Sequence, residues 1–318
     1  MNRVLITGSL GQIGSELCTF LRQYLGSDNV LATDIRKIES HPVCTNGNFK
    51  ILDVLDSDNF EKIVEEFKPD TLIHLAALLS ATAEKNPQFA WKLNIDGLFT
   101  ALEISKKYNL KFFIPSSIAA FGDNTPKIDT PQDTIQRPSS MYGITKVSGE
   151  LLCDYYHTKY GVDTRSLRLP GIISYDTLPG GGTTDYAVEI FYDALSKGLY
   201  KCYIDENSSM DMMYMPDTIK AIVQLLEAPS ENLKHRNAYN VSAMSFTPKQ
   251  IAQSIKKHLP NFEIVYEVDP IRQNIANSWP DSINSDCAKN EWGFSADYKL
   301  DEMVEDMLAK LKEKGIGC

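Results

Sequence analysis

The chain has 318 residues, of which 43% are hydrophobic and 23% are charged, a composition typical of folded globular proteins and not of disordered ones. Its 32 basic and 42 acidic residues give a formal net charge of −10, which would repel nucleic acids and anionic membranes. The longest apolar stretch, residues 72–81, is about half as long as a bilayer span requires, so we expect neither nucleic acid nor a membrane as a partner.

Short apolar segments alternate with longer amphipathic segments along the first half of the chain. The segments typical of strands are Val4–Thr7, Val30–Thr33, Thr71–Ala76, Lys111–Pro115 and Thr164–Leu169. Between them, apolar residues recur every three or four positions, as in an amphipathic helix. Because strands that alternate with helices pair in parallel through crossover connections, we expect an α/β fold with a Rossmann-type, doubly wound parallel sheet.

After Leu169 this alternation becomes less regular. A glycine-rich loop at residues 179–182 is followed by a helical pattern over Tyr186–Ser196, and then by irregular stretches rich in Asn, Ser and Pro. We expect this part of the chain to build a smaller, discontinuous lobe beside the sheet.

Three glycines stand at the junction of the first expected strand and the first expected helix. Gly8 permits a tight turn, Gly11 lets a pyrophosphate approach the amides at the helix N-terminus, and Gly14 lets helix and strand pack closely. An ordinary strand-to-helix turn would explain the glycines alone. It would not explain Asp34, which ends the second expected strand 20 residues after Gly14, where a dinucleotide-binding protein places an acidic residue.

Asp34 also indicates which dinucleotide is bound. A carboxylate there accepts hydrogen bonds from the hydroxyls of the adenosine ribose and repels a 2′-phosphate, which favours NAD over NADP. Arg36 would either contact a 2′-phosphate or be a solvated turn residue. Asp53, which follows two apolar residues, would either bind the adenine amino group or stand at the entry of a helix near Asp56.

A second motif places Tyr142 and Lys146 on one side of a helix. Tyr155 and Lys159 have the same spacing, but Tyr155 lies roughly 220° around the helix from Tyr142, so only one pair can face a cofactor. We favour Tyr142, because it stands at the start of its helix where the chain leaves a loop.

One more segment, Pro115-Ser116-Ser117 through Phe121-Gly122, follows the fourth expected strand. Together with the glycine motif, Asp34 and the pair of Tyr142 and Lys146, it resembles the extended short-chain dehydrogenase/reductase family over the whole chain. The resemblance puts Ser117 in the place of the catalytic serine, with Ser116 as the near alternative. It matches Asn94 to an asparagine that organises a water near the lysine, although a packing role would suit Asn94 equally well.

The resemblance also implies a cofactor site and a division of the chain. The cofactor-binding residues are expected to be Gly8, Gly11, Gln12, Ile13, Asp34, Arg36, Asp53, Val54, Leu75, Ala76, Ala77, Asn94, Tyr142, Lys146, Leu169 and Ile172. The NAD-binding domain would comprise residues 1–169 and about 211–243, and the substrate-binding lobe about 170–210 and 244–318. A homodimer would form through the helices that contain Ala101 and Leu151.

Five segments resemble one branch of that family, the short-chain L-threonine 3-dehydrogenases: residues 76–81, 169–174, 179–186, 212–215 and 278–280. The substrate implied is L-threonine, and the residues expected to bind it are Ser80, Ser117, Tyr142, Gly180, Thr184, Asp185 and Trp279. Asp185 could pair the substrate ammonium, but Thr184 or Asp185 before a helix also looks like an N-cap. Trp279 would close over the substrate methyl or be a buried aromatic without ligand contact.

The residue types suit alcohol oxidation. A secondary alcohol gives hydride to nicotinamide and its hydroxyl proton to a base, and a tyrosine with an ordinary pKa of about 10 would rarely be ionised at neutral pH. We expect Lys146 and the positive nicotinamide to lower the pKa of Tyr142, which acts as the base, while Ser117 orients the hydroxyl.

The cysteines and histidines show no metal-binding spacing, so we expect free thiols and no zinc. The expected location is the cytoplasm, or the mitochondrial matrix if a transit peptide has been removed.

Overall fold

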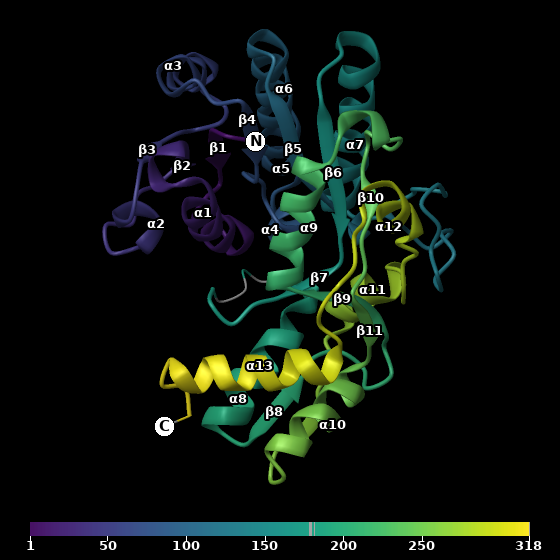
Figure 1. The fold of residues 1–318 in the computed structure, drawn as a ribbon. Coiled ribbons are helices and arrows are strands. Elements are labelled where there is room, and N and C mark those ends of the chain that lie inside the picture. Colours follow the sequence, from purple (N-terminus) through teal and green to yellow (C-terminus); the bar gives the residue numbers. More distant parts are fainter. Residues whose placement is uncertain (178–179, 181, 318) are drawn as a thin grey trace.

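The computed structural model describes residues 1–177, 180 and 182–317, which form an upper lobe around a large sheet and a smaller lower lobe (Figure 1). The large sheet has seven parallel strands in the order β10-β6-β5-β4-β1-β2-β3. The strand order reverses at β1, so the carboxyl ends of β1 and β4 form the crevice where doubly wound sheets bind ligands. The expected α/β, Rossmann-type fold is confirmed.

The strands of this sheet are β1 (Val4–Thr7), β2 (Val30–Asp34), β3 (Phe49–Ile51), β4 (Thr71–His74), β5 (Lys111–Ser117), β6 (Thr164–Leu169) and β10 (Tyr239–Asn240). Alternate residues of β1 point to opposite faces, as strand geometry requires. Val4 and Ile6 join one buried cluster, and Leu5 joins another. The sheet is therefore buried on both faces.

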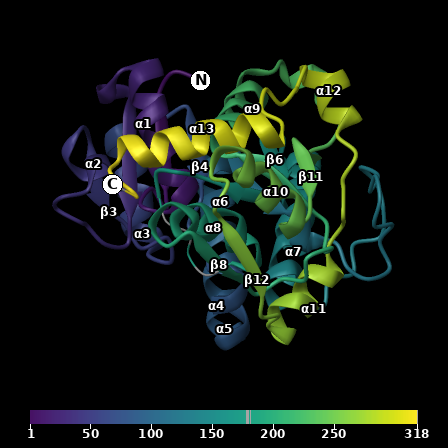
Figure 2. The ribbon, with the colours of Figure 1, turned by 90° about the horizontal axis from the view of Figure 1, so that it is seen from below.

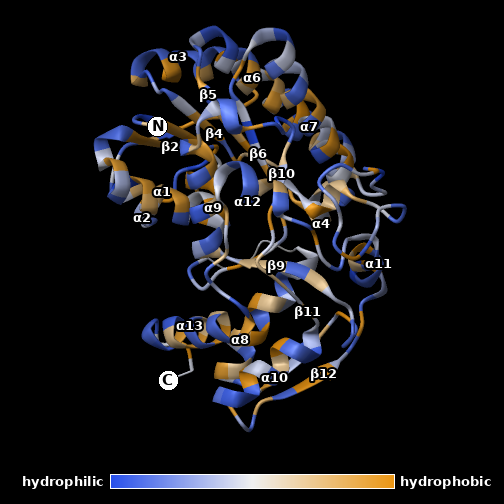
Figure 3. Cartoon of the chain, turned by 45° about the vertical axis from the view of Figure 1, so that its right-hand side comes forward, coloured by the Kyte–Doolittle hydropathy of each residue, from blue (hydrophilic) through white to orange (hydrophobic). Residues whose placement is uncertain are grey.

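Helices cover both faces of the sheet. They are α1 (Gln12–Leu25), α2 (Pro42–Thr45), α3 (Ser57–Phe67), α4 (Ser80–Lys85), α5 (Pro87–Trp91), α6 (Gly97–Tyr108), α7 (Met141–Tyr160), α9 (Met215–Glu227) and α12 (Asp286–Trp292). The buried apolar residues of α1 and α9 pack on one face of the sheet, and those of α3, α6 and α7 pack on the other face. Figure 3 shows hydrophobic and hydrophilic residues on the same helices, as one-sided burial requires.

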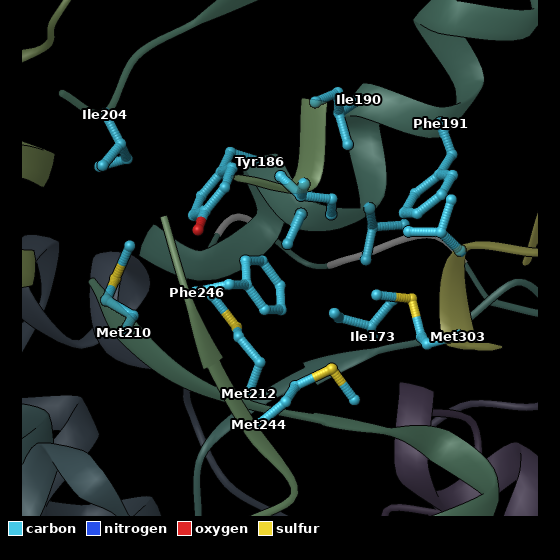
Figure 4. Packing of buried hydrophobic residues seen from close by; sticks show 14 of the residues in the cluster. Ile173, Tyr186, Ile190, Phe191, Ile204, Met210, Met212, Met244, Phe246 and Met303 are labelled. Carbon is cyan, nitrogen blue, oxygen red and sulfur yellow. The ribbon is translucent and has the colours of Figure 1, made fainter. Parts of the chain in front are cut away.

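The lower lobe contains two small sheets and four helices. Its strands are β7 (Gly171–Ile173), β9 (Met210–Tyr214) and β11 (Met244–Phe246) in one sheet, and β8 (Leu199–Cys202) with β12 (Glu263–Tyr266) in the other. Its helices are α8 (Tyr186–Ser196), α10 (Pro248–His258), α11 (Pro270–Ser278) and α13 (Leu300–Glu313). Figure 4 shows Met212 and Met244 of the three-stranded sheet in the same buried cluster as Phe191 of α8 and Met303 of α13.

The expectation that the chain beyond Leu169 has mainly irregular structure after one helix was wrong. Helices α9, α10 and α13 lie there, and each buries one apolar side. Figure 2 shows α13 crossing the lower side of the molecule near α8 and α10. The proposed domain boundary near residue 211 falls within β9 and stays a prediction, as does the location in the cell. No helix among the described residues is long and apolar enough to span a bilayer.

Candidate active site

The glycine turn between β1 and α1 is shaped for close approach. Gly8 has a φ of +67°, and a Cβ there would lie 2.7 Å from the Ala76 backbone nitrogen. A Cβ on Gly14 would lie 2.4 Å from the Gly8 carbonyl oxygen. Gly11 is the N-cap of α1 and has no side chain with which to cap it, so the amides of the first turn are available to an anion.

Asp34 lies at the end of β2, beside this turn. Its Oδ2 accepts a hydrogen bond from the Leu10 N–H at 3.1 Å, which ties the carboxylate to the glycine turn. The Arg36 N–H donates to Oδ1 at 3.5 Å. Asp53 accepts from the Leu55 N–H at 3.0 Å, whereas Asp56 is the N-cap of α3, so Asp53 is not the residue that caps that helix.

A cavity of about 250 Å³ opens at the carboxyl ends of β1, β4 and β5 and extends to the lower lobe. The expected site residues that line it are Gly8, Gly11, Gln12, Ile13, Leu75, Ala77, Ser80, Ser117, Tyr142, Lys146, Leu169, Ile172, Thr184, Asp185 and Trp279. They come from both lobes, so the cavity is built by segments far apart in the sequence.

The other expected residues lie elsewhere. Asp34, Arg36, Asp53, Val54 and Gly180 do not line this cavity. Ala76 and Asn94 line a much smaller adjoining cavity of about 20 Å³, which shares Lys146 with the larger one. Residues 179 and 181 of the expected glycine-rich loop lie outside the described residues.

Tyr142, Lys146 and Ser117 converge on the large cavity. Tyr142 stands in the first turn of α7, whose N-cap Ser140 accepts from the Gly143 N–H at 3.1 Å. The Lys146 Nζ lies 5.2 Å from the centroid of the Tyr142 ring. Ser117, at the end of β5, lies close enough to the Tyr142 phenol to lower its pKa. Tyr155 is 50% exposed and packs against neighbouring tyrosines instead.

Burial decides how these groups titrate when the chain is considered by itself. It raises the pKa of Tyr142 to about 12, and the nearby Ser117 hydroxyl opposes this shift. Burial lowers the pKa of Lys146 to about 8, and the Glu150 carboxylate opposes that shift. The expectation that Lys146 lowers the pKa of Tyr142 is therefore not met by the residues of this chain alone, because desolvation dominates.

The partners that hold Lys146 were not predicted from the sequence. Its Nζ donates to the Pro115 carbonyl oxygen at 2.6 Å. Glu150, one helical turn further along α7, is 2% exposed and pairs with Arg168 through an Nη2 to Oε2 distance of 2.8 Å. Ser116 donates to Glu150 at 2.5 Å, so it supports this network while Ser117 faces Tyr142. The spacing of Lys146 and Glu150 is the one signal that could have found the network.

Asn94 lies in one turn of π-helix, and its side chain hydrogen-bonds other residues of the chain. Its Oδ1 accepts from the Leu78 N–H at 2.8 Å, and its Nδ2 donates to the Leu78 carbonyl at 3.1 Å and to the Thr145 hydroxyl at 3.1 Å. These bonds favour the packing role over a water ligand for the side chain, because both ends of the amide are engaged.

Asp185 closes a short turn over Thr183–Asp185 before α8. Its Oδ2 accepts from the Gly182 N–H at 2.5 Å, while the Asp185 N–H lies 3.5 Å from the Gly182 carbonyl oxygen. The carboxylate thus binds the N–H of Gly182, which precedes it in the chain. It makes no side-chain capping hydrogen bond to α8, although Asp185 is the N-cap residue of that helix. It also lines the cavity, so the capping contact and a substrate contact are compatible.

Trp279 is 7% exposed and lines the cavity from the end of α11. The loop before α7 holds it in place. Lys127 Nζ donates to the carbonyls of Asn277 at 2.9 Å and Trp279 at 3.3 Å, and its own carbonyl accepts from the Asp281 N–H at 2.8 Å. This support could not be predicted from local sequence, because the two segments are about 150 residues apart.

The sequence matches the NAD dependent epimerase/dehydratase family over residues 4–242. An uncharacterised epimerase/dehydratase of Staphylococcus haemolyticus is 59% identical over 314 residues, which cover 99% of each chain.

Solved structures are similar over the full length. L-threonine dehydrogenase from Clostridium difficile matches with a TM-score of 0.98 and 60% identity, covering 100% of this chain and 99% of that one. A monomeric L-threonine 3-dehydrogenase found in metagenomic sequences matches with a TM-score of 0.94 and 42% identity, covering 98% and 99%.

Proposed function

The chain belongs to the NAD dependent epimerase/dehydratase family, and we propose that it oxidises the 3-hydroxyl of L-threonine with NAD⁺ to give 2-amino-3-oxobutanoate and NADH. The observation that supports this most is the convergence of Ser117, Tyr142 and Lys146 on one cavity. The similarity of the whole chain to L-threonine dehydrogenases, at 60% identity for the Clostridium difficile enzyme, supports the choice of substrate.

The residues of the chain fit NAD. The crowding around Gly8 and Gly14 leaves room only for backbone, and the first turn of α1 offers its amides to a pyrophosphate. Asp34 would bind the hydroxyls of the adenosine ribose, and Lys146 those of the nicotinamide ribose. When bound, NAD⁺ would supply a hydride acceptor and a positive charge.

Tyr142 is the proposed base. Its phenolate oxygen would take the proton of the substrate hydroxyl while a hydride leaves the carbon that bears this hydroxyl for NAD⁺, so the carbonyl would form without a charged intermediate on the substrate. With a pKa raised to about 12 by burial, Tyr142 needs nearby positive charge to ionise at neutral pH. Lys146 provides part of it, because its pKa of about 8 leaves most of the ammonium protonated there.

Ser117 and the lower lobe place the substrate. The Ser117 hydroxyl, close to the Tyr142 phenol, would donate to the substrate oxygen and keep it within reach of the base. We assign the substrate ammonium to Asp185 and its carboxylate to Ser80 and Thr184, which line the cavity with it. Trp279, held by Lys127, lies where it can cover the substrate methyl.

A second candidate is a nucleotide-sugar epimerase or dehydratase with a permanently bound NAD. The family name and the name of the Staphylococcus haemolyticus relative favour it. Such an enzyme would use the same Tyr142 and Lys146, so the motif alone does not separate the two functions.

The test is NADH formation, followed by absorbance, with L-threonine, D-threonine, L-serine and a sugar nucleotide in parallel. We expect turnover with L-threonine, weak or no turnover with the other amino acids, and no NAD retained through purification. Turnover of the sugar nucleotide must be followed by chromatography of the product, because an epimerase or dehydratase leaves no net NADH. Retained NAD together with a converted sugar nucleotide would replace the proposed function by the second candidate.

A further inference from the structure

A second group of polar side chains lies outside the cavity, where α12 packs against β10 at the edge of the large sheet (Figure 1). His235 comes from the turn before β10, and Cys287 and Glu291 come from α12. An imidazole nitrogen, the thiol sulfur and a carboxylate oxygen lie within 4.8 Å of one another, and all three side chains are partly buried. None of them lines the cavity of the candidate active site.

We propose that His235, Cys287 and Glu291 bind a zinc ion at this edge of the sheet, separate from the cofactor cavity. Imidazole, thiolate and carboxylate are the ligands that proteins offer to Zn²⁺, and three of them leave a fourth position for water or another side chain. Cys287 and Glu291 are four residues apart on α12, so the helix presents both to the same point.

The surrounding bonds orient two of these ligands. Glu291 Oε2 accepts from the Lys234 N–H at 3.0 Å and from the Tyr239 hydroxyl. Its Oε1 is then directed toward His235 Nε2, 3.6 Å away. The His235 ring packs edge-on against Tyr239 at 5.3 Å between centroids. Supporting contacts of this kind fix the ligands of metal sites before the metal binds.

Nearby carboxylates favour a cation. Asp133 Oδ1 lies 3.8 Å from His235 Nδ1, and its side chain is 80% exposed, so it can turn toward a bound ion.

The expectation of no zinc came from sequence spacing, which could not bring these residues together. His235 and Cys287 are 52 residues apart, and only the packing of α12 on β10 joins them. The competing explanation is an ion pair in which a protonated His235 faces Glu291 and Asp133 without a metal. The two explanations differ in whether the Cys287 sulfur takes part.

The experiment uses the full chain, stripped of metals with a chelator and then titrated with Zn²⁺ by calorimetry. Co²⁺ serves as a second probe, since a cobalt–thiolate bond absorbs strongly in the near ultraviolet. We expect one ion per chain and a cobalt–thiolate band in the wild type. Cys287→Ser should remove the band and weaken zinc binding at least about tenfold, and Glu291→Gln should weaken it similarly.

Cys44→Ser is the matched control, because Cys44 is another partly buried free cysteine. It lies on a different helix, α2, whose N-cap residue is His41. This variant should leave the stoichiometry, the affinity and the cobalt band unchanged. Zinc should also raise the melting temperature of the wild type and of Cys44→Ser but not of Cys287→Ser. Equal zinc binding by the wild type and Cys287→Ser, or no saturable binding at all, would overturn the site in favour of the ion pair.

Discussion

Tyr142 carries the proposed chemistry, so its hydroxyl should matter far more than its ring. Tyr142→Phe removes the proton acceptor but keeps the wall of the cavity. We expect kcat for L-threonine to fall by about 10²–10⁴-fold, with NADH affinity from fluorescence titration almost unchanged. Tyr155→Phe, from the exposed pair with the same spacing, should keep wild-type kcat. A Tyr142→Phe enzyme with near wild-type kcat would contradict the assignment of the base.

Asp34 should determine which cofactor is used. Its carboxylate is fixed by the Leu10 N–H at 3.1 Å, so it cannot turn away from a 2′-phosphate at low cost. Like charges held together cost several kcal/mol, so kcat/KM should favour NAD over NADP by at least about 10²-fold. Asp34→Ser should bring the kcat/KM values for NAD and NADP closer together. Equal kcat/KM for both cofactors in the wild type would refute the role of Asp34.

Asp185 separates an amino-alcohol substrate from a sugar nucleotide. Asparagine can still accept from the Gly182 N–H, so Asp185→Asn should preserve the turn before α8 and remove only the negative charge. If the carboxylate pairs the buried ammonium, kcat/KM for L-threonine should fall by a factor that corresponds to roughly 2–5 kcal/mol of lost transition-state stabilisation. The affinity for NAD should not change.

The control for Asp185→Asn is Asp56→Asn, at a helix N-cap away from the cavity. Both variants should melt close to the wild-type temperature, since asparagine caps about as well as aspartate. Unchanged kcat/KM in Asp185→Asn would leave only the capping role.

At the residue scale, the sequence predicted the groups whose type and spacing are tied to the chemistry. Ser117, Tyr142 and Lys146 lie together as expected, although the pKa of Tyr142 is governed by burial. Glu150 and Lys127 were missed because their contacts are tertiary. Only the four-residue spacing from Lys146 marks Glu150 in the local sequence, and nothing there distinguishes Lys127 from an ordinary charged side chain.

At the element scale, prediction succeeded where the pattern was long and strongly periodic. The five expected strands and the helix over Tyr186–Ser196 are present. β3 and β10 were missed because they have only three and two residues. A capping box at Thr247 and Gln250, with Pro248 at the first helical position, signals the start of α10 and could have been recognised.

Asp211 on β9 makes the stability of the lower lobe depend on pH. Its carboxylate is buried, and it accepts from the Ser242 hydroxyl and the Ile283 N–H, each at 2.8 Å. Burial raises its pKa to about 7, above the ordinary 3.8, and these hydrogen bonds oppose the shift. The folded chain therefore binds more protons than the unfolded chain between those values, so stability falls as pH rises through that range.

The expected slope from Asp211 is up to about 1.4 kcal/mol per pH unit. Glu16, whose pKa burial also raises to about 7, should add to it. Urea unfolding between pH 5 and pH 8 should therefore show a steeper loss of stability in the wild type than in Asp211→Asn, which does not ionise. Parallel curves for the two proteins would show that Asp211 does not ionise in this range.

At the scale of the whole molecule, the outer surface of α6 and α7 suggests self-association. Phe99, Leu151 and Tyr155 are 48%, 63% and 50% exposed, and the two helices pack side by side. Ala101, which the sequence analysis used to mark the first of these helices, is fully buried and can take no part in an interface. An apolar patch of this kind typically marks a protein interface.

We predict that the chain forms a homodimer through this surface, in contrast to the relative that is described as monomeric. Light scattering at micromolar concentration should give twice the mass of one chain. Leu151→Glu would bury a charge on each side of a twofold interface and should shift the mass to that of a monomer. Ile271→Glu, at a 72% exposed apolar residue of α11, is the control and should leave the dimer intact. A monomeric wild type would show that the exposed residues of α6 and α7 do not mediate dimerisation. Because the cavity is built from one chain, loss of the dimer should leave kcat for L-threonine unchanged.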